Sequence, residues 1–144
     1  MRIKTLILLS ALFILNSCRL EHKEIEETYA DGSPKRVCVY LGKGDNRELI
    51  RETTYYDNKQ IQMDGGYKHK KRNGKWVYYH EDGKIWSEGF FINGKSDGVR
   101  KTYFDNGKLR YEGNYKEDVR VGKWRFYDEN GRLIKEVDYS PKNK

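Results

Sequence analysis

Three glutamates, Glu88, Glu112 and Glu136, recur at intervals of 24 residues, and repeated carboxylates could perform acid–base chemistry. On equivalent strands of successive hairpins, neighbouring acids would lie about 10 Å apart. Inverting glycosidases hold their two carboxyl groups roughly 6.5–9.5 Å apart, which is close to that distance. Acid–base catalysis needs carboxyl groups of different pKa, however, whereas repeated environments give all three acids the same pKa. We therefore interpret the acids as a structural row, hydrogen-bonded to or paired with neighbouring strands.

No other group of residues forms a catalytic or metal-binding pattern. The histidines His22, His69 and His80 lack the His-Glu-x-x-His spacing of zinc enzymes, and no Gly-x-Ser-x-Gly motif is present. The segment 42–45, Gly-Lys-Gly-Asp, lacks the remainder of a phosphate-binding loop and indicates a turn. The sequence therefore predicts no catalytic residue, no metal site, no cofactor and no enzymatic activity.

The N-terminus has the composition of a secretion signal. Arg2 and Lys4 precede an apolar run over residues 6–15, and small or polar residues then lead to Cys18. The apolar run is too short to cross a bilayer, which needs about 20 helical residues. Residues 1–17 are therefore predicted to be a signal peptide.

The end of this segment, Leu15-Asn16-Ser17-Cys18, resembles the lipobox of bacterial lipoprotein precursors. The resemblance implies cleavage before Cys18 and acylation of that cysteine, with several acyl chains giving a stable membrane anchor. A plain secreted protein is the alternative. We expect an exported, lipid-anchored protein, at the outer membrane, with residues 18–28 as lipidated cysteine and charged tether and residues 140–144 as a polar tail. With Cys18 acylated, Cys38 has no intramolecular disulfide partner and is expected to be a small strand residue.

The composition favours strands and argues against nucleic acid as a partner. The chain has 12 tyrosines, 3 tryptophans and 14 glycines, which suit strands joined by turns. Its formal net charge is +7, but basic residues are interspersed with acidic ones and form no basic tract.

The body of the chain repeats with a period of 24 residues. A strand-like run, a short turn containing glycine and a second strand-like run form each unit, which predicts a β-hairpin. Tandem hairpins predict an all-β protein, an antiparallel meander over residues 29–139. The recurring positions are Gly74, Gly98 and Gly122; Gly83, Gly107 and Gly131; Tyr79, Tyr103 and Tyr127; Ile61, Ile85, Leu109 and Leu133, with Val37 one step earlier; and Gly65, Gly89 and Gly113.

Strand alternation assigns side chains to two faces. Gly65, Gly89 and Gly113 are predicted to lie where an aromatic ring, from Tyr79, Tyr103 or another repeat position, crosses bare backbone. The opposite face varies more between units and is the candidate binding face, carried by Trp86, Phe90 and Arg110.

The pattern Tyr-x-x-x-Gly-x-Leu-x-x-Glu-Gly-x-Tyr over residues 103–115, followed by Gly-Lys-Trp at 122–124, resembles the bacterial variant of the MORN repeat. It is similar to repeats of the antitoxin-like YwqK family. Two positions depart from the pattern: Arg100 stands where tryptophan is expected, and Lys59 replaces a turn glycine.

Three functions are consistent with these features. The first is a membrane-anchored lipoprotein whose sheet binds or scaffolds another protein at the cell envelope. The second, implied by the YwqK resemblance alone, is an antitoxin or immunity protein whose partner is a toxin. The third is a module that binds glycans or lipid headgroups.

Overall fold

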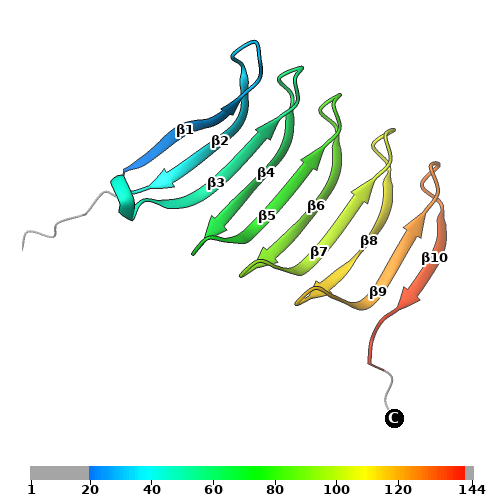
Figure 1. Cartoon of the computed structure of the whole chain (residues 1–144). Helices are drawn as coiled ribbons and strands as arrows, with labels where there is room; N and C mark the ends of the chain where they lie inside the picture. The colour runs from blue at the N-terminus through cyan, green and yellow to red at the C-terminus, as the bar shows by residue number, and fades with distance from the viewer. Residues whose placement is uncertain (1–19, 142–144) are drawn as a thin grey trace, which may run out of the picture.

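The computed structural model describes residues 20–141, which form one ten-stranded antiparallel sheet whose strand order follows the chain (Figure 1). The predicted all-β meander is confirmed. Cys18 and the predicted signal peptide lie outside the described residues, as do the last three residues of the predicted tail. The strands are β1 (Glu21–Thr28), β2 (Pro34–Leu41), β3 (Glu48–Tyr55), β4 (Ile61–Lys68), β5 (Lys71–Tyr79), β6 (Ile85–Ile92), β7 (Lys95–Tyr103), β8 (Leu109–Lys116), β9 (Val119–Tyr127) and β10 (Leu133–Asp138), with a 3₁₀ turn, η1 (Gly44–Asn46), between β2 and β3.

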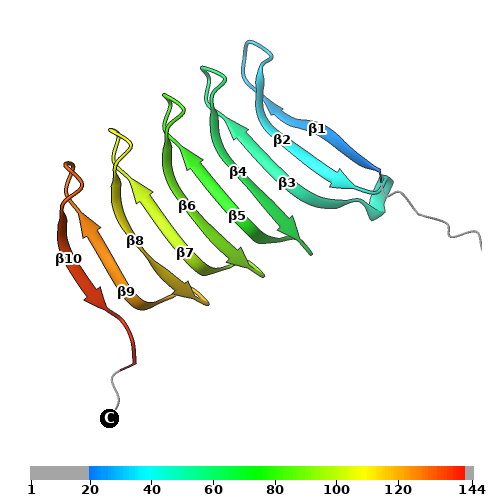
Figure 2. The same cartoon turned by 180° about the vertical axis from the view of Figure 1, so that it is seen from behind.

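The strands form five hairpins whose tips lie along one edge of the sheet, and β1 and β10 are its two ends (Figures 1 and 2). Each tip places one residue in the left-handed region that glycine adopts readily. Lys59 occupies this position in the second hairpin with φ 69°, so the predicted departure from glycine keeps the same turn. The glycines at the other tips are Gly32, Gly83, Gly107 and Gly131, with φ of 81°, 82°, 80° and 85°.

The first repeat is longer than the others because the connection between β2 and β3 contains η1. Cys38 pairs with Glu52 as Gly65 pairs with Trp76, although 14 residues separate the first pair and 11 the second. The alignment of Val37 with Ile61 is therefore wrong. Pro34, opposite Thr28, takes the position that Ile61 has opposite Tyr55.

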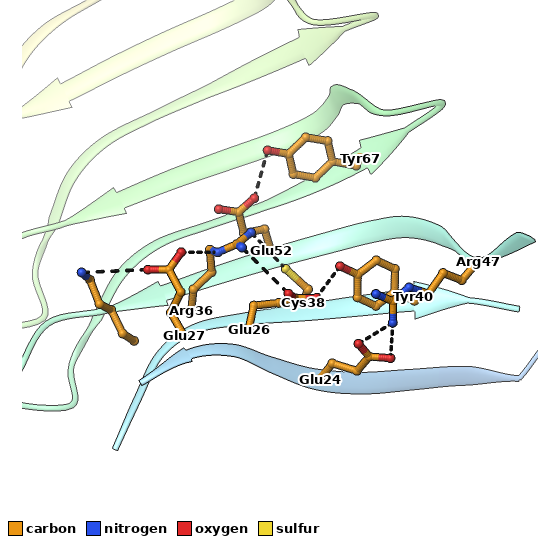
Figure 3. A network of polar contacts seen from close by, with 10 residues as sticks. Glu24, Glu26, Glu27, Arg36, Cys38, Tyr40, Arg47, Glu52 and Tyr67 are labelled. Carbon is orange, nitrogen blue, oxygen red and sulfur yellow. Dashed lines mark hydrogen bonds and ion pairs between the residues drawn. The ribbon is translucent and has the colours of Figure 1, made fainter. Parts of the chain in front are cut away.

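The prediction of a tether is wrong for residues 21–28, which form β1. This strand pairs with β2, and its acids bond to residues of later strands (Figure 3). Glu26 accepts a 2.6 Å hydrogen bond from Tyr40, and Glu27 accepts one of 2.9 Å from Arg36. The acidic segment is ordered by partners that are distant in sequence, which a local pattern cannot reveal.

The two surfaces of the sheet differ in chemistry. We call the side that carries Trp76, Arg100 and Trp124 the tryptophan face, and the side that carries Glu88, Glu112 and Glu136 the acidic face. The core lies on the tryptophan face, where Trp76 and Trp124 are fully buried although the sheet is a single layer. Their own repeat must therefore supply the cover.

Candidate functional site

Each buried tryptophan lies against a glycine of the preceding strand. A Cβ on Gly65 would come within 2.1 Å of Trp76 Cδ2, so the indole occupies the space of the missing side chain. The Trp76 Nε1–H donates to the Gly66 carbonyl at 3.0 Å, and the Arg72 guanidinium lies 4.3 Å from the ring centre. A cation near the ring face is favourable and shields the indole from water.

The same arrangement recurs at Gly113, where Trp124 replaces Trp76 and Arg120 replaces Arg72, with 4.4 Å between guanidinium and ring centre. The predicted crossing of bare backbone is therefore present, but the ring belongs to tryptophan and not to Tyr79 or Tyr103. The covering arginines were not predicted. Their 24-residue spacing was the signal that could have revealed them.

The middle repeat departs from this arrangement. Arg100 stands at the tryptophan position, and its side chain lies over Gly89, whose Cβ would come within 2.9 Å of Arg100 Nε. The departure noticed in the sequence therefore places a cation in the row of tryptophans.

The acidic row is held by partners on adjacent strands. Glu88 pairs with Lys75 at 2.6 Å and accepts a 2.8 Å hydrogen bond from Tyr103. Glu112 accepts a 3.2 Å hydrogen bond from Tyr127. Glu136 lies 3.1 Å from Lys123 and 3.1 Å from Arg125. Such engagement is what a structural row requires.

The tyrosine and carboxyl groups of this row shift each other's pKa. The Lys75 ammonium, followed by the Tyr103 hydroxyl, lowers the pKa of Glu88 below its usual 4.5. Burial, with the hydrogen bond to Glu88, raises the pKa of Tyr103 to about 12. Glu88 therefore stays ionised, which suits an ion pair and not a catalytic acid. Tyr79 differs: its carbonyl accepts a 2.7 Å hydrogen bond from Tyr56.

The candidate binding residues are divided between the two faces. Phe90 pairs with Lys75 on the acidic face. Trp86 is an extra residue, because Tyr78 pairs with Ser87 and Tyr79 with Ile85. This bulge turns Trp86 to the tryptophan face, where its ring packs edge-on to Tyr78 at 6.3 Å.

Arg110 is displaced in the same way, because Thr102 pairs with Tyr111 and Tyr103 with Leu109. Its guanidinium lies 5.5 Å from the ring centre of Phe104. The assignment of Trp86, Phe90 and Arg110 to one face was therefore wrong for Phe90, since a bulge reverses the alternation from which it was made.

Bulges at equivalent positions line up an apolar strip along the tryptophan face, near the hairpin tips. Trp86 is 47% exposed and Ile134 is 66% exposed. Two open hollows flank them, of about 470 Å³ and 520 Å³. We call this set the aromatic strip; it comprises Tyr56, Met63, Tyr78, Trp86, Phe104, Tyr111, Phe126 and Ile134.

Cys38 is buried beside Arg36, whose Nη1 lies 3.7 Å from the sulfur (Figure 3). Burial raises the pKa of the thiol, which keeps it protonated and unreactive. The expectation of a small strand residue agrees with this position.

A further hollow of about 900 Å³ opens beside η1, between Tyr40, Arg47 and Lys70. Arg47 is paired with Glu24, so its charge is already compensated. Residues 42–45, predicted to be a turn, enter η1.

Within residues 20–141 no helix is long and apolar enough to span a bilayer. In the same range, no group of three or more His, Cys, Asp or Glu side chains is arranged to hold a metal ion.

Three consecutive segments, residues 72–93, 96–117 and 120–140, match the family model of the MORN repeat variant. The chain contains MORN repeats. Each matched segment begins at or next to the position of Arg72 and includes one glycine–tryptophan position. The first two hairpins lie outside the matched segments, and they are where η1 lengthens the repeat and Glu52 replaces tryptophan.

No curated protein matches this sequence. Among solved structures, a TarM mutant of S. aureus in complex with Fondaparinux, alpha-GlcNAc-glycerol and UDP is similar over 71% of this chain, with 16% identity and a TM-score of 0.34. The present chain covers 18% of that chain, and so low a similarity supports no inference.

Proposed function

We propose that the protein is a membrane-anchored lipoprotein whose MORN-repeat sheet is a non-enzymatic binding module for another protein at the cell envelope. The observation that carries this proposal is the aromatic strip. Large apolar side chains exposed together on one face are typical of protein-binding surfaces.

The form of the strip favours a protein over a small molecule. Its hollows are open and follow one another across several strands, whereas small-molecule sites enclose most of the ligand. Aromatic and arginine side chains are enriched at the centres of protein interfaces, and the strip contains Trp86 and Arg110.

The non-enzymatic part of the proposal is supported by the paired state of the repeated acids. Glu88, Glu112 and Glu136 are all engaged by basic or hydroxyl groups. A general acid needs a raised pKa, and the pKa values of Glu88 and Glu136 are lowered instead.

The antitoxin or immunity role is a second candidate that rests on the YwqK resemblance alone. Export to the envelope is unsuited to an antitoxin that acts on a cytoplasmic toxin. Protection of a host by co-expression against a toxin encoded beside this gene would favour this role. A glycan- or lipid-headgroup-binding module is the third candidate, and binding on a glycan array would favour it.

The binding proposal is tested with two aromatic residues on opposite faces. Trp86 and Phe90 are 47% and 45% exposed, so either substitution removes a similarly accessible ring. Trp86→Ser should abolish cross-linking to an envelope protein that the wild type captures reproducibly, and Phe90→Ser should retain it. Equal capture by both variants, or hydrolytic activity of the purified protein, would contradict the proposal.

Anchoring is tested separately at Cys18. Cys18→Ser should abolish acylation and either release the protein or leave an uncleaved precursor. A variant that is processed normally and stays in the membrane at the wild-type level would overturn the lipoprotein proposal, whatever the result for Trp86.

A further inference from the structure

The middle MORN repeat interrupts the tryptophan face. At four neighbouring positions it carries a smaller or more polar residue than the repeats on either side. The interruption is a coordinated change, because all four positions lie on the same face of β6 and β7. The positions are Ser87 against Met63 and Tyr111; Thr102 against Tyr78 and Phe126; Ser96 against Arg72 and Arg120; and Arg100 against Trp76 and Trp124.

Arg100 lies at the centre of this polar interruption. Its guanidinium carbon is 5.8 Å from the Phe91 ring centre and 5.9 Å from that of Tyr115. Its Nη1 is 3.4 Å from Ser87 Oγ, a long hydrogen bond. Among residues 20–141, no carboxylate forms an ion pair with Arg100.

The arginines of the flanking repeats are engaged differently. Arg72 lies 4.3 Å from the Trp76 ring centre and donates a 3.0 Å hydrogen bond to Tyr78. Arg120 lies 4.4 Å from the Trp124 ring centre and donates to Tyr139 at 3.2 Å. These two cover tryptophans, whereas Arg100 has no tryptophan to cover and keeps most of its five N–H donors available.

We propose that Arg100 binds a carboxylate of an acidic side chain on the protein partner. This inference rests on the proposed function and specifies the chemistry of its partner. A guanidinium presents paired donors that match a carboxylate in a bidentate arrangement. The Phe91 and Tyr115 rings limit hydration around it, which strengthens the attraction between opposite charges.

Two buried hydroxyls complete the position. Ser87 and Thr102 are 5% and 4% exposed, and their oxygens lie 3.2 Å apart. Ser87 Oγ also lies 3.1 Å from the Lys101 carbonyl, to which it donates, so that its oxygen is free to accept from Arg100. This contact orients the guanidinium while leaving its other donors for the ligand.

The position lies beside the aromatic strip. Ser87 follows Trp86 directly, and Tyr78 contacts the Trp86 ring. An extended acidic segment could therefore place apolar side chains on the strip and one carboxylate on Arg100.

The test uses the full chain purified in detergent and two labelled hexapeptides, one of alternating Tyr and Glu and the other of alternating Tyr and Gln. Fluorescence anisotropy should show the Glu peptide binding at least about tenfold more tightly, equivalent to roughly 1.4 kcal/mol. Arg100→Gln should remove this preference. Arg110→Gln, which removes the same charge from the same face, should retain it.

Arg100→Trp restores the tryptophan of the neighbouring repeats and provides a second variant should Arg100→Gln fail to fold. It should remain folded by circular dichroism and lose the preference for Glu. If Arg100→Trp prefers the Glu peptide as strongly as the wild type does, the inference is wrong.

The remaining outcomes separate the inference from the proposed function. Equal binding of both peptides, weakened by Trp86→Ser, would overturn the carboxylate position and leave the strip intact. No binding of either peptide would count against both. Displacement of the Glu peptide by inorganic phosphate, but not by acetate, would assign Arg100 to phosphate and overturn the proposal.

Discussion

Trp124 crosses Gly113 so closely that a Cβ on that glycine would lie 2.2 Å from Trp124 Cδ2. Real Cβ atoms do not approach other atoms at this distance. The indole is fully buried by this contact together with Arg120 and the neighbouring rings. The pair therefore joins β8 to β9 through a contact that only glycine permits.

Gly113→Ala should destabilise the protein by about 1–3 kcal/mol, because the indole must leave its place on the sheet. Such a loss is a large part of a typical total of about 5–15 kcal/mol. Gly89→Ala is the matched control, since its Cβ would meet only the movable Arg100 side chain, at 2.9 Å. Urea unfolding should show a smaller loss for Gly89→Ala. Equal losses would contradict the packing account.

Lys59→Gly should stabilise the protein, because Lys59 holds φ at 69° where the other hairpin tips carry glycine. A side chain in the left-handed region costs roughly 1–2 kcal/mol, partly offset by the greater freedom of glycine in the unfolded chain. The reciprocal change, Gly83→Lys, should destabilise by a similar amount. Thermal melts of the two variants should shift in opposite directions, and a shift of the same sign would refute the prediction.

Stability should fall in acid through Glu88. The pKa of this carboxyl is lowered from 4.5 by Lys75 and Tyr103, so the unfolded chain binds its proton more readily than the folded protein. The resulting stability is present above about pH 4.5 and is lost as the pH falls through the folded pKa. Glu88→Gln should reduce this dependence in urea unfolding between pH 5 and 3, a range set roughly by the usual carboxyl pKa.

Glu112→Gln is the control for that experiment. Glu112 has a longer hydrogen bond, 3.2 Å from Tyr127, and a longer ion pair, 3.8 Å from Arg125. Its substitution should cost about 1 kcal/mol or less. A variant of Glu112 that melts normally but loses partner binding would assign the acidic row a functional role.

Tyr103 should ionise near pH 12, since burial and the bond to Glu88 raise its pKa to about 12. The folded protein then holds this proton more tightly than the unfolded chain, so stability declines as the pH rises from 10 through the folded pKa. Ultraviolet titration of the wild type and Tyr103→Phe isolates this phenol by difference. A transition near pH 10 would show that the Glu88 contact is not formed.

The repeat itself determined much of the fold. Its 24-residue period, the glycines at the hairpin tips and the glycines of the central strands were enough to predict an antiparallel meander with side chains lying on bare backbone. These are local requirements, because a turn that needs positive φ or a backbone that needs open space restricts the residue type at that position.

The tertiary structure decided which residues meet. The ring on Gly113 belongs to Trp124 because the two strands bring these positions together, and two-residue alternation within one strand does not contain that pairing. Bulges then moved Trp86 and Arg110 to the tryptophan face, because one extra residue reverses the direction of the side chain.

The N-terminal strand depended even more on distant partners. Residues 21–28 have no apolar period, yet Arg36, Tyr40 and Arg47 bind the acids of this segment and order it as β1. The sequence by itself determined the repeating unit and its turns, whose causes are local. The strand pairing across the sheet alone decided the ends of the fold and the side on which each binding residue lies, because those depend on contacts between segments far apart in the chain.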